Sequence, residues 1–439
     1  MSEVAPQASG SSPATCVDLL ENEGTAYIYL DGVTTVTFFD GPAPLEQLKS
    51  RLVQIVKASP WVAGKLVTSK GRPGESKKGT VQMAFDPAPS EDLILSTLLQ
   101  ETDALELSPT LPYEHLTKAL SKSPVKPHVT TGWDILKKGL SYTKVTVARG
   151  KSGTSWALIF SVSHVVADGY TYYKLLGMFS GSAPIISLNP VRKPAFLPAV
   201  KRAVGEAEYK TVMGAPSLIV NYLSNMLFGK TPRVYAFYVD AEKIEAAKKQ
   251  HKLKNAGADG TDFVSTNDIL TTWWGRLTRA RLLEMALNFR GRMTSDPNLV
   301  SEDAGNYEFC ILFSPQDFQD PSLIRKSLQR KDGRFCSVLD PPRPLPGCWS
   351  TMRCRYRIIS NWASFFTDIE LEGCTQTLHI PYLNPSEMPT DICVIFRPTR
   401  DTLGVYVVTR KLKDEVFVTG ANGAEALLGK QIMQSAGAK

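Results

Sequence analysis

Alternating apolar and polar residues predict a series of short strands, two of which are expected to be neighbours. Residues 33–39 alternate Val, Thr and Phe and are followed by an Asp-Gly-Pro turn. Residues 140–148 and 155–163 show the same two-residue period, and a short Arg-Gly-Lys-Ser-Gly segment joins them. We therefore expect two adjacent strands, of which the second ends directly before His164.

Apolar residues that recur every three or four positions predict helices between these strands. Such spacing runs over residues 45–56, and this helix should end before Pro60 because proline cannot continue a helix. The same spacing occurs in residues 170–179. Further along the chain, we expect a basic helix over residues 241–254 and another helix that opens at Ser265, a typical N-cap residue.

Chain length and the distribution of proline predict two lobes joined by a long connection. A chain of 439 residues is too long for one ordinary core and suggests two domains of about 200 residues each. Small and polar residues dominate the start of the chain, so we expect a flexible tail over residues 1–22. Five prolines favour a crossover linker over residues 182–231. The lobes would then span residues 23–181 and 232–439.

Composition is typical of a well-packed globular protein and narrows the possible functions. Hydrophobic residues make up 43% and charged residues 21%, which excludes a disordered or collagen-like chain. The net charge of +7 mildly favours an anionic ligand but is modest for this length, so we expect no nucleic acid partner. Because we find no run of about 18 apolar residues and no secretory signal, we expect a cytoplasmic protein without a membrane span. The seven cysteines lack zinc-type spacing, and no metal is expected.

The segment that carries chemistry lies between the predicted strand and helix and reads Ser-His-Val-Val-Ala-Asp-Gly over residues 163–169. A neutral imidazole can take up a proton near pH 7, and such a base contributes about 10²- to 10⁴-fold to a rate. His164 is therefore a candidate general base. Asp168 would pair with an arginine in a structural role, and Gly169 would supply the backbone freedom for the turn. The alternative is a buried core histidine followed by an aspartate N-cap.

This motif resembles the His-x-x-x-Asp-Gly signature of the plant and fungal BAHD acyltransferases, and further elements of that family follow in order. Residues 59–66, Ser-Pro-Trp-Val-Ala-Gly-Lys-Leu, resemble its first-lobe pattern. Residues 264–281 resemble its helix ending in Trp-Arg and Ala-Arg, and residues 305–307, Gly-Asn-Tyr, resemble its Gly-Asn element. Residues 360–362, Ser-Asn-Trp, are similar to the stretch before its Asp-Phe-Gly-Trp-Gly motif. The resemblance covers about residues 27–411.

The resemblance implies a fold and a reaction. The expected fold is α/β, with two chloramphenicol-acetyltransferase-like lobes built on mixed sheets and a tunnel between them, with His164 at its centre. The expected reaction moves an acyl group from acyl-CoA to a hydroxyl or amine of a small molecule, without an acyl-enzyme. Acyl-CoA would be a co-substrate, and no cofactor would be permanently bound. The resemblance further implies a monomer that acts in secondary metabolism.

The resemblance also implies roles for residues of the second lobe. Ser360 and Trp362 match positions that line the tunnel opposite His164, where a hydrogen-bond donor would stabilise the oxyanion of a tetrahedral intermediate. Buried packing within a strand is the alternative for both residues. Among the arginines at the end of the second-lobe helix, we expect Arg276 to pair with Asp168.

Four residues are expected to contact the phosphates of coenzyme A. Ser265 and Thr266 open a predicted helix, and a helix start favours anions. Lys252 and Lys254 carry ammonium groups at the end of the preceding basic helix. The alternative is a basic helix whose charges are simply solvated.

Two departures from the family pattern leave other functions open. Residues 370–374 read Glu-Leu-Glu-Gly-Cys where the family has Asp-Phe-Gly-Trp-Gly, a motif regarded as mainly structural. This difference motivates the alternative of a noncatalytic, two-lobed binding or assembly protein. Condensation domains of the same fold usually carry two consecutive histidines, whereas Ser163 precedes His164 here. A free acyl-CoA donor is therefore favoured over a carrier-protein thioester, which is the third alternative.

Overall fold

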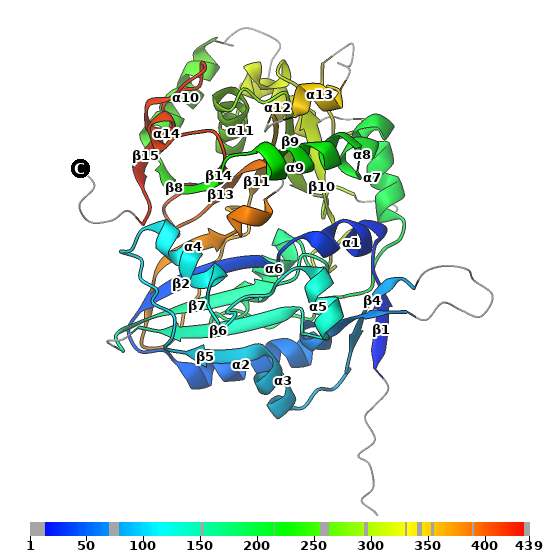
Figure 1. Ribbon diagram of the computed structural model, residues 1–439, viewed down its shortest axis with the longest axis vertical. Coiled ribbons are helices and arrows are strands. Elements are labelled where there is room, and N and C mark those ends of the chain that lie inside the picture. Colours follow the sequence, from blue (N-terminus) through cyan, green and yellow to red (C-terminus); the bar gives the residue numbers. More distant parts are fainter. Residues whose placement is uncertain are drawn as a thin grey trace, which may run out of the picture.

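Two large mixed sheets and one small antiparallel sheet organise the chain (Figure 1). The five-stranded sheet has the order β12 (Thr375–Tyr382), β2 (Val33–Asp40), β7 (Ser155–Val162), β6 (Thr143–Arg149) and β5 (Leu99–Thr102). The seven-stranded sheet has the order β10 (Glu308–Phe313), β9 (Leu282–Asn288), β11 (Tyr356–Asn361), β13 (Asp391–Phe396), β14 (Gly404–Thr409), β8 (Arg233–Val239) and β15 (Leu428–Gln431). The small sheet consists of β1 (Thr15–Asp18), β4 (Val81–Phe85) and β3 (Lys65–Thr68).

Helices cover these sheets and connect them. This computed structural model describes residues 14–69, 79–150, 153–214, 216–254, 263–293, 297–329, 332–339, 345–352, 355–388 and 390–433. No helix in these ranges is long and apolar enough to cross a membrane. The helices are α1 (Glu21–Thr25), α2 (Leu45–Ala58), α3 (Glu91–Leu98), α4 (Tyr113–Ser121), α5 (Gly132–Lys138), α6 (Gly169–Gly177), α7 (Phe196–Val204), α8 (Glu206–Val212), α9 (Pro216–Phe228), α10 (Ala241–Lys254), α11 (Thr266–Leu277), α12 (Pro321–Leu328), α13 (Cys348–Thr351) and α14 (Asp414–Thr419).

Each large sheet has its own hydrophobic core. The first core joins buried side chains of β2, β6 and β7 with those of α2 and α6. The second core joins buried side chains of β9, β10 and β14 with those of α7 and α11. Figure 1 shows the seven-stranded sheet in the upper half of the molecule and the five-stranded sheet in the lower half. The molecule therefore has two lobes, and the end of β7 with the start of α6 lies between them.

The local predictions for the first lobe are confirmed. The alternation in residues 33–39 gives β2, and β6 and β7 are antiparallel neighbours as expected. The predicted helix over residues 45–56 is α2, which ends at Ala58 before Pro60. Its apolar residues at three- and four-residue spacing, such as Leu48, Leu52 and Ile55, are buried against the first core because they share one helix face.

Two of the predicted boundaries were wrong. Residues 1–13 of the predicted tail lie outside the described residues, but Thr15–Asp18 forms β1 and pairs with β4. The predicted linker over residues 182–231 contains the helices α7, α8 and α9. The apolar face of α7 is buried in the second core, with Phe196 and Val200 fully covered. Prolines at the starts of helices, where their missing N–H costs nothing, explain why a proline-rich segment can be helical.

One strand crosses between the lobes, so residues 232–439 do not all belong to the second lobe. β12 comes from the C-terminal half of the chain, but it pairs antiparallel with β2 at the edge of the five-stranded sheet. His379 of β12 lies within this first lobe, where its Nδ1 and Nε2 atoms are 2.9 Å from Thr37 Oγ1 and Tyr173 Oη. This pairing is non-local and leaves no signal in the local pattern of residues.

Candidate active site

His164 directly follows β7, where the chain leaves the five-stranded sheet and turns into α6. The residues around it, Ser163, Val165 and Val166, are buried, whereas the imidazole keeps 22% of its surface exposed. The ring of Tyr27 packs against the imidazole with a distance of 4.8 Å between the ring centroids. The fold therefore holds the motif rigidly and leaves the imidazole within reach of a small molecule.

The amide of Asn306 fixes the orientation of the imidazole. His164 Nδ1 lies 3.0 Å from Asn306 Oδ1. The Nδ2 group of Asn306 donates to a Glu23 carboxylate oxygen at 2.9 Å and to the His164 carbonyl oxygen at 2.8 Å, and these two acceptors assign the orientation of the amide. Since an amide oxygen only accepts, Nδ1 carries the proton. Nε2 then keeps the lone pair that a general base needs.

A buried ion pair supports Asn306 from behind. Arg192 donates from Nε to the Glu23 carboxylate at 2.8 Å, and these side chains are 3% and 0% exposed. The guanidinium also donates to the carbonyl oxygens of Val166 and Ala304. A Cβ atom at Gly305 would lie 2.7 Å from the Arg192 guanidinium carbon, so this close approach requires glycine. A series of hydrogen bonds therefore runs from Arg192 through Glu23 to Asn306. These buried, charge-assisted bonds orient His164.

Asp168 forms a second buried ion pair, but its partner is Arg290. The distance from Arg290 Nη1 to Asp168 Oδ2 is 2.7 Å, and both side chains are at most 2% exposed. Asp168 also accepts from the backbone N–H of Thr171, so it is the N-cap of α6, and from that of Tyr307. The prediction of a structural role for Asp168 agrees with this geometry.

The predicted partner Arg276 was wrong. Its guanidinium donates to the carbonyl oxygens of Phe318 and Gln319. Arg276 lies in α11, whereas Arg290 lies further along the sequence, in the turn after β9. Four side chains make up these two pairs, which we call the buried ion-pair cluster: Glu23, Arg192, Asp168 and Arg290.

Glu308 places a carboxylate opposite the second nitrogen of the imidazole. Its Oε1 atom lies 3.5 Å from His164 Nε2. Burial raises the pKa of Glu308 from its ordinary 4.5 to about 7; of the neighbouring charges, His164 and Arg290 lower this pKa and Asp168 raises it. When ionised, Glu308 would stabilise a protonated imidazole. The pair can therefore hold a proton taken from a substrate.

Ser360 and Trp362 lie next to each other, and Trp362 reaches the motif. Trp362 Nε1 donates to Ser360 Oγ at 3.1 Å. A Cβ atom at Gly169 would lie 3.7 Å from Trp362 Nε1, so the indole packs against the start of α6. Gly169 is the first residue of that helix, but its φ is not in the left-handed region, so the predicted need for the backbone freedom of glycine is not borne out. An oxyanion role for Ser360 and Trp362 stays a prediction, as does the tunnel.

Ser265 is the N-cap of α11, and its side chain is committed to that cap. Ser265 Oγ accepts from the backbone N–H of Asp268, and the Asp268 carboxylate accepts from the Ser265 N–H. Arg325 pairs with the same carboxylate at 2.6 Å. The predicted helix start is therefore confirmed, but a carboxylate already occupies this end of the helix.

The structure does not bring the four expected coenzyme-binding residues together. Thr266 lines a pocket with Ala241, the first residue of α10. Lys254, at the other end of α10, lines a different pocket with Arg276 near the end of α11. α10 and α11 therefore run in the same direction, and ten helical residues separate Thr266 from Arg276 by about 15 Å. Lys252 and Lys254 lie far from the helix start.

The segment that differs from the family's Asp-Phe-Gly-Trp-Gly motif holds the first lobe together through its backbone. The N–H of Glu370 donates to Ser180 Oγ, and its carbonyl oxygen accepts from the N–H of Gly181. The N–H of Glu372 donates to the Gln47 side chain in α2. Backbone bonds of this kind do not depend on the side chains, so the degenerate sequence still performs a structural role.

Glu23, Asn306 and Glu308 were not predicted as site residues. Asn306 was noted only within the Gly-Asn element, but an extended chain places residues 306 and 308 on the same face. That spacing could have shown that Glu308 accompanies Asn306. Glu23 left no such signal, because it meets Asn306 across 283 residues. Among the described residues, no cluster of three or more His, Cys, Asp or Glu side chains could hold a metal ion.

Comparison with known proteins gives matches by structure. No family model matches the chain, and no curated protein matches it in sequence. TRI101 of F. graminearum, solved with coenzyme A and deoxynivalenol, is 14% identical, with 91% of this chain and 96% of that chain covered and a TM-score of 0.59. Vinorine synthase is 13% identical, with 98% and 97% covered and a TM-score of 0.56. Polyketide synthase associated protein 5 from Mycobacterium tuberculosis is 13% identical, with 91% and 95% covered and a TM-score of 0.54.

These similarities extend over both sheets and the segments that connect them. The chain shares the fold of TRI101 and vinorine synthase. The predicted class, α/β with mixed sheets in two lobes, is confirmed. At 13 to 14% identity these structures establish the fold alone. The reaction must be argued from the residues at His164.

Proposed function

We propose that this protein transfers an acyl group from acyl-CoA to a hydroxyl or amine of a small molecule, with His164 as the general base. The observation that carries the proposal is the orientation of the imidazole. Asn306 accepts the proton of Nδ1, and the partly exposed edge of the ring presents Nε2. By contrast, the buried His379 has both ring nitrogens bonded to Thr37 and Tyr173, whereas His164 keeps 22% of its side chain exposed.

The reaction would proceed in one direct transfer. The acceptor oxygen or nitrogen donates its hydrogen to Nε2 and attacks the thioester carbonyl carbon, and this forms a tetrahedral intermediate. The intermediate collapses, the carbon–sulfur bond breaks, and the coenzyme A thiolate takes the proton back from the imidazolium. Atoms and charges balance without a covalent acyl-enzyme. Acyl-CoA is a co-substrate in this scheme, and Ser360 is the proposed donor to the oxyanion.

Glu308 would assist by stabilising the imidazolium of this intermediate. A carboxylate 3.5 Å from Nε2 favours the protonated ring while the intermediate exists. A protonated Glu308 would instead donate toward Nε2 and compete with the acceptor. With the pKa of Glu308 raised to about 7, the rate should therefore rise as the pH increases through neutrality.

The choice of donor is supported by the proteins that share the fold. TRI101 was solved with coenzyme A together with deoxynivalenol or T-2 mycotoxin. By analogy, we assign acyl-CoA as the donor and a small molecule as the acceptor. The single histidine of the motif favours a free coenzyme A thioester over a carrier-protein thioester. The oriented imidazole disfavours the noncatalytic alternative.

The test is thioester consumption by the purified protein with a panel of acyl-CoAs and pooled hydroxyl and amine acceptors. Wild type should release coenzyme A, and His164→Ala should reduce the rate by about 10²- to 10⁴-fold. His115→Ala, which removes a histidine from α4 in the first lobe, is the matched control and should retain the rate. Folded wild type that neither binds coenzyme A nor consumes any acyl-CoA would refute the proposal.

A further inference from the structure

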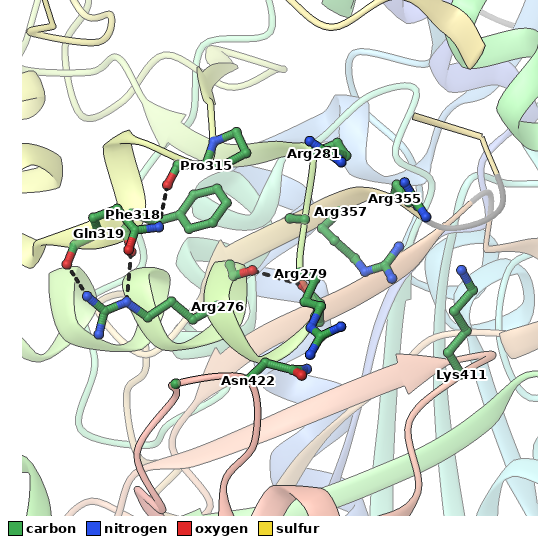
Figure 2. A pocket seen from close by; sticks show the side chains of 14 residues that line it. Arg276, Arg279, Arg281, Pro315, Phe318, Gln319, Arg355, Arg357, Lys411 and Asn422 are labelled. Atoms are coloured by element: carbon green, nitrogen blue, oxygen red, sulfur yellow. Dashed lines mark hydrogen bonds between the residues drawn. The ribbon is translucent and has the colours of Figure 1, made fainter. Parts of the chain in front are cut away.

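A pocket in the second lobe is lined by cationic side chains that the proposed reaction does not use. Its volume is about 800 Å³, within the range of about 300 to 1,000 Å³ that is typical of small-molecule sites. None of its described lining residues is acidic. We call it the arginine pocket, and Figure 2 shows its six cationic residues: Arg276, Arg279, Arg281, Arg355, Arg357 and Lys411.

Two of these arginines are held in place by the protein. Arg276 donates to the carbonyl oxygens of Phe318 and Gln319, as the dashed lines in Figure 2 show. Arg357 is 2% exposed, and its Nη2 lies 3.7 Å from the Asp391 carboxylate. Arg276 is therefore fixed by two carbonyl groups of the pocket lining itself, and Arg357 by a carboxylate that is not among the lining residues.

Three further arginines of the pocket are exposed, and their side chains have no partner among the described residues. Arg279 and Arg281 follow α11, and Arg355 precedes β11. The N–H of Arg281 donates to the Arg355 carbonyl oxygen, so these two residues lie side by side. Within the described ranges, none of the three side chains forms a hydrogen bond or an ion pair. Like charges that converge without counter-charges repel one another, and an anion would relieve this repulsion.

The backbone of Arg279 is strained, because this residue adopts a conformation that favours glycine. Arg279 has a φ of 49°, in the left-handed region that glycine prefers. The Ala280 N–H donates to the Gly275 carbonyl oxygen, which closes the end of α11 in the pattern of a Schellman motif. Glycine is the usual residue at this position, so an arginine here strains the backbone and suggests a function for its side chain.

From these observations we propose that the arginine pocket binds a small molecule that carries several phosphate groups. Guanidinium groups match phosphate oxygens in a bidentate geometry, and six cations suit a ligand with several negative charges. The pocket is separate from His164. Arg281 precedes β9, whereas Glu308 pairs with Asn288 at the other end of that strand. Seven extended residues place the two sites roughly 20 Å apart.

The test is isothermal titration calorimetry of the full chain with inorganic tripolyphosphate. Wild type should bind, and Arg281→Gln and Arg355→Gln should each weaken binding by about tenfold, since each removes a charge-assisted hydrogen-bond donor. Arg279→Gly should weaken binding without lowering the thermal midpoint, because glycine relieves the strain. A merely structural arginine would not separate these two readouts.

The matched control is the triple variant Lys122→Gln, Lys137→Gln and Lys138→Gln, which removes three exposed charges from the first lobe. It should leave tripolyphosphate binding unchanged. Wild type that fails to bind, or a control that weakens binding as much as the pocket variants, overturns the proposal. The three pocket variants should also retain coenzyme A binding, and a parallel loss would show that the pocket serves the acyl donor instead. None of these measurements depends on acyl transfer.

Discussion

Two groups of charged side chains in this molecule differ in how completely their charges are paired. The buried ion-pair cluster beneath the motif has no side chain more than 3% exposed, and every cation in it meets a carboxylate. The arginine pocket contains exposed cations and no acidic lining residue among those described. The paired charges of the cluster support the scaffold, whereas the exposed Arg279, Arg281 and Arg355 are the cations that we propose bind an anion.

The same contrast holds within the candidate active site. Asp168 accepts hydrogen bonds from Arg290 and from two backbone N–H groups. Both of its carboxylate oxygens are therefore engaged in structural hydrogen bonds. His164 has one nitrogen committed to Asn306 and a second that faces Glu308 at 3.5 Å. We infer that Asp168 positions the motif and that His164 acts on the substrate.

Breaking the buried ion-pair cluster should have the largest effect on stability. Arg290→Met leaves Asp168 as an uncompensated buried charge, which costs about 3 to 5 kcal/mol. Urea denaturation should show this loss in the free energy of unfolding. The double variant Asp168→Asn with Arg290→Met should recover part of it, because no charge then remains unpaired. Equal losses in the single and double variants would contradict the assignment.

Glu308 offers the next test, because it is a carboxylate of the candidate site whose pKa is raised by burial. Its pKa is raised in the folded state, so the folded protein binds the proton more tightly, and stability falls as the pH rises from about 4.5 to about 7. Glu308→Gln does not ionise. The variant should therefore gain at most about 3 kcal/mol relative to wild type between pH 4 and pH 8. A pH-independent difference in unfolding free energy would exclude this effect.

Asn306 tests whether the orientation of the imidazole matters. Asn306→Ala removes the acceptor for Nδ1, so the ring can take the wrong tautomer or rotate, and kcat should fall about 10²-fold. The KM for acyl-CoA should change little, because Asn306 contacts the imidazole rather than a substrate. Steady-state kinetics on folded variant, checked by circular dichroism, measures this split. A rise in KM with unchanged kcat would assign Asn306 to substrate binding.

The smallest effect is expected at Arg279. Arg279→Gly replaces a non-glycine residue in the left-handed region and should stabilise the fold by about 1 kcal/mol at most. Thermal unfolding monitored by calorimetry would detect the change. Destabilisation would mean that the Arg279 side chain is needed by the fold, and the contrast between the two charged groups would then weaken.

The sequence predicted the motif and the elements around it because their signals are local. The two-residue period of β7 and the helical spacing after Gly169 identify where His164 lies. An aspartate N-cap belonged to the alternative interpretation of a buried core histidine, and Asp168 is the N-cap of α6. These features depend on residues within a few positions of one another.

The partners of the motif could not be predicted in the same way. Arg290 meets Asp168 across 122 residues and Glu23 meets Asn306 across 283, and neither pairing has a local period. Several arginines lie near the end of α11, so the choice of Arg276 rested on position alone. The strand β12 joins the first lobe for the same non-local reason.

Chemical rescue of His164→Ala tests the central claim most directly. The variant should lose about 10²- to 10⁴-fold in acyl-CoA turnover, and added imidazole should restore part of the rate in a saturable, pH-dependent manner. Rescue would mean that the missing ring supplies a base rather than a packing contact. A variant that retains the wild-type rate without imidazole would contradict the account.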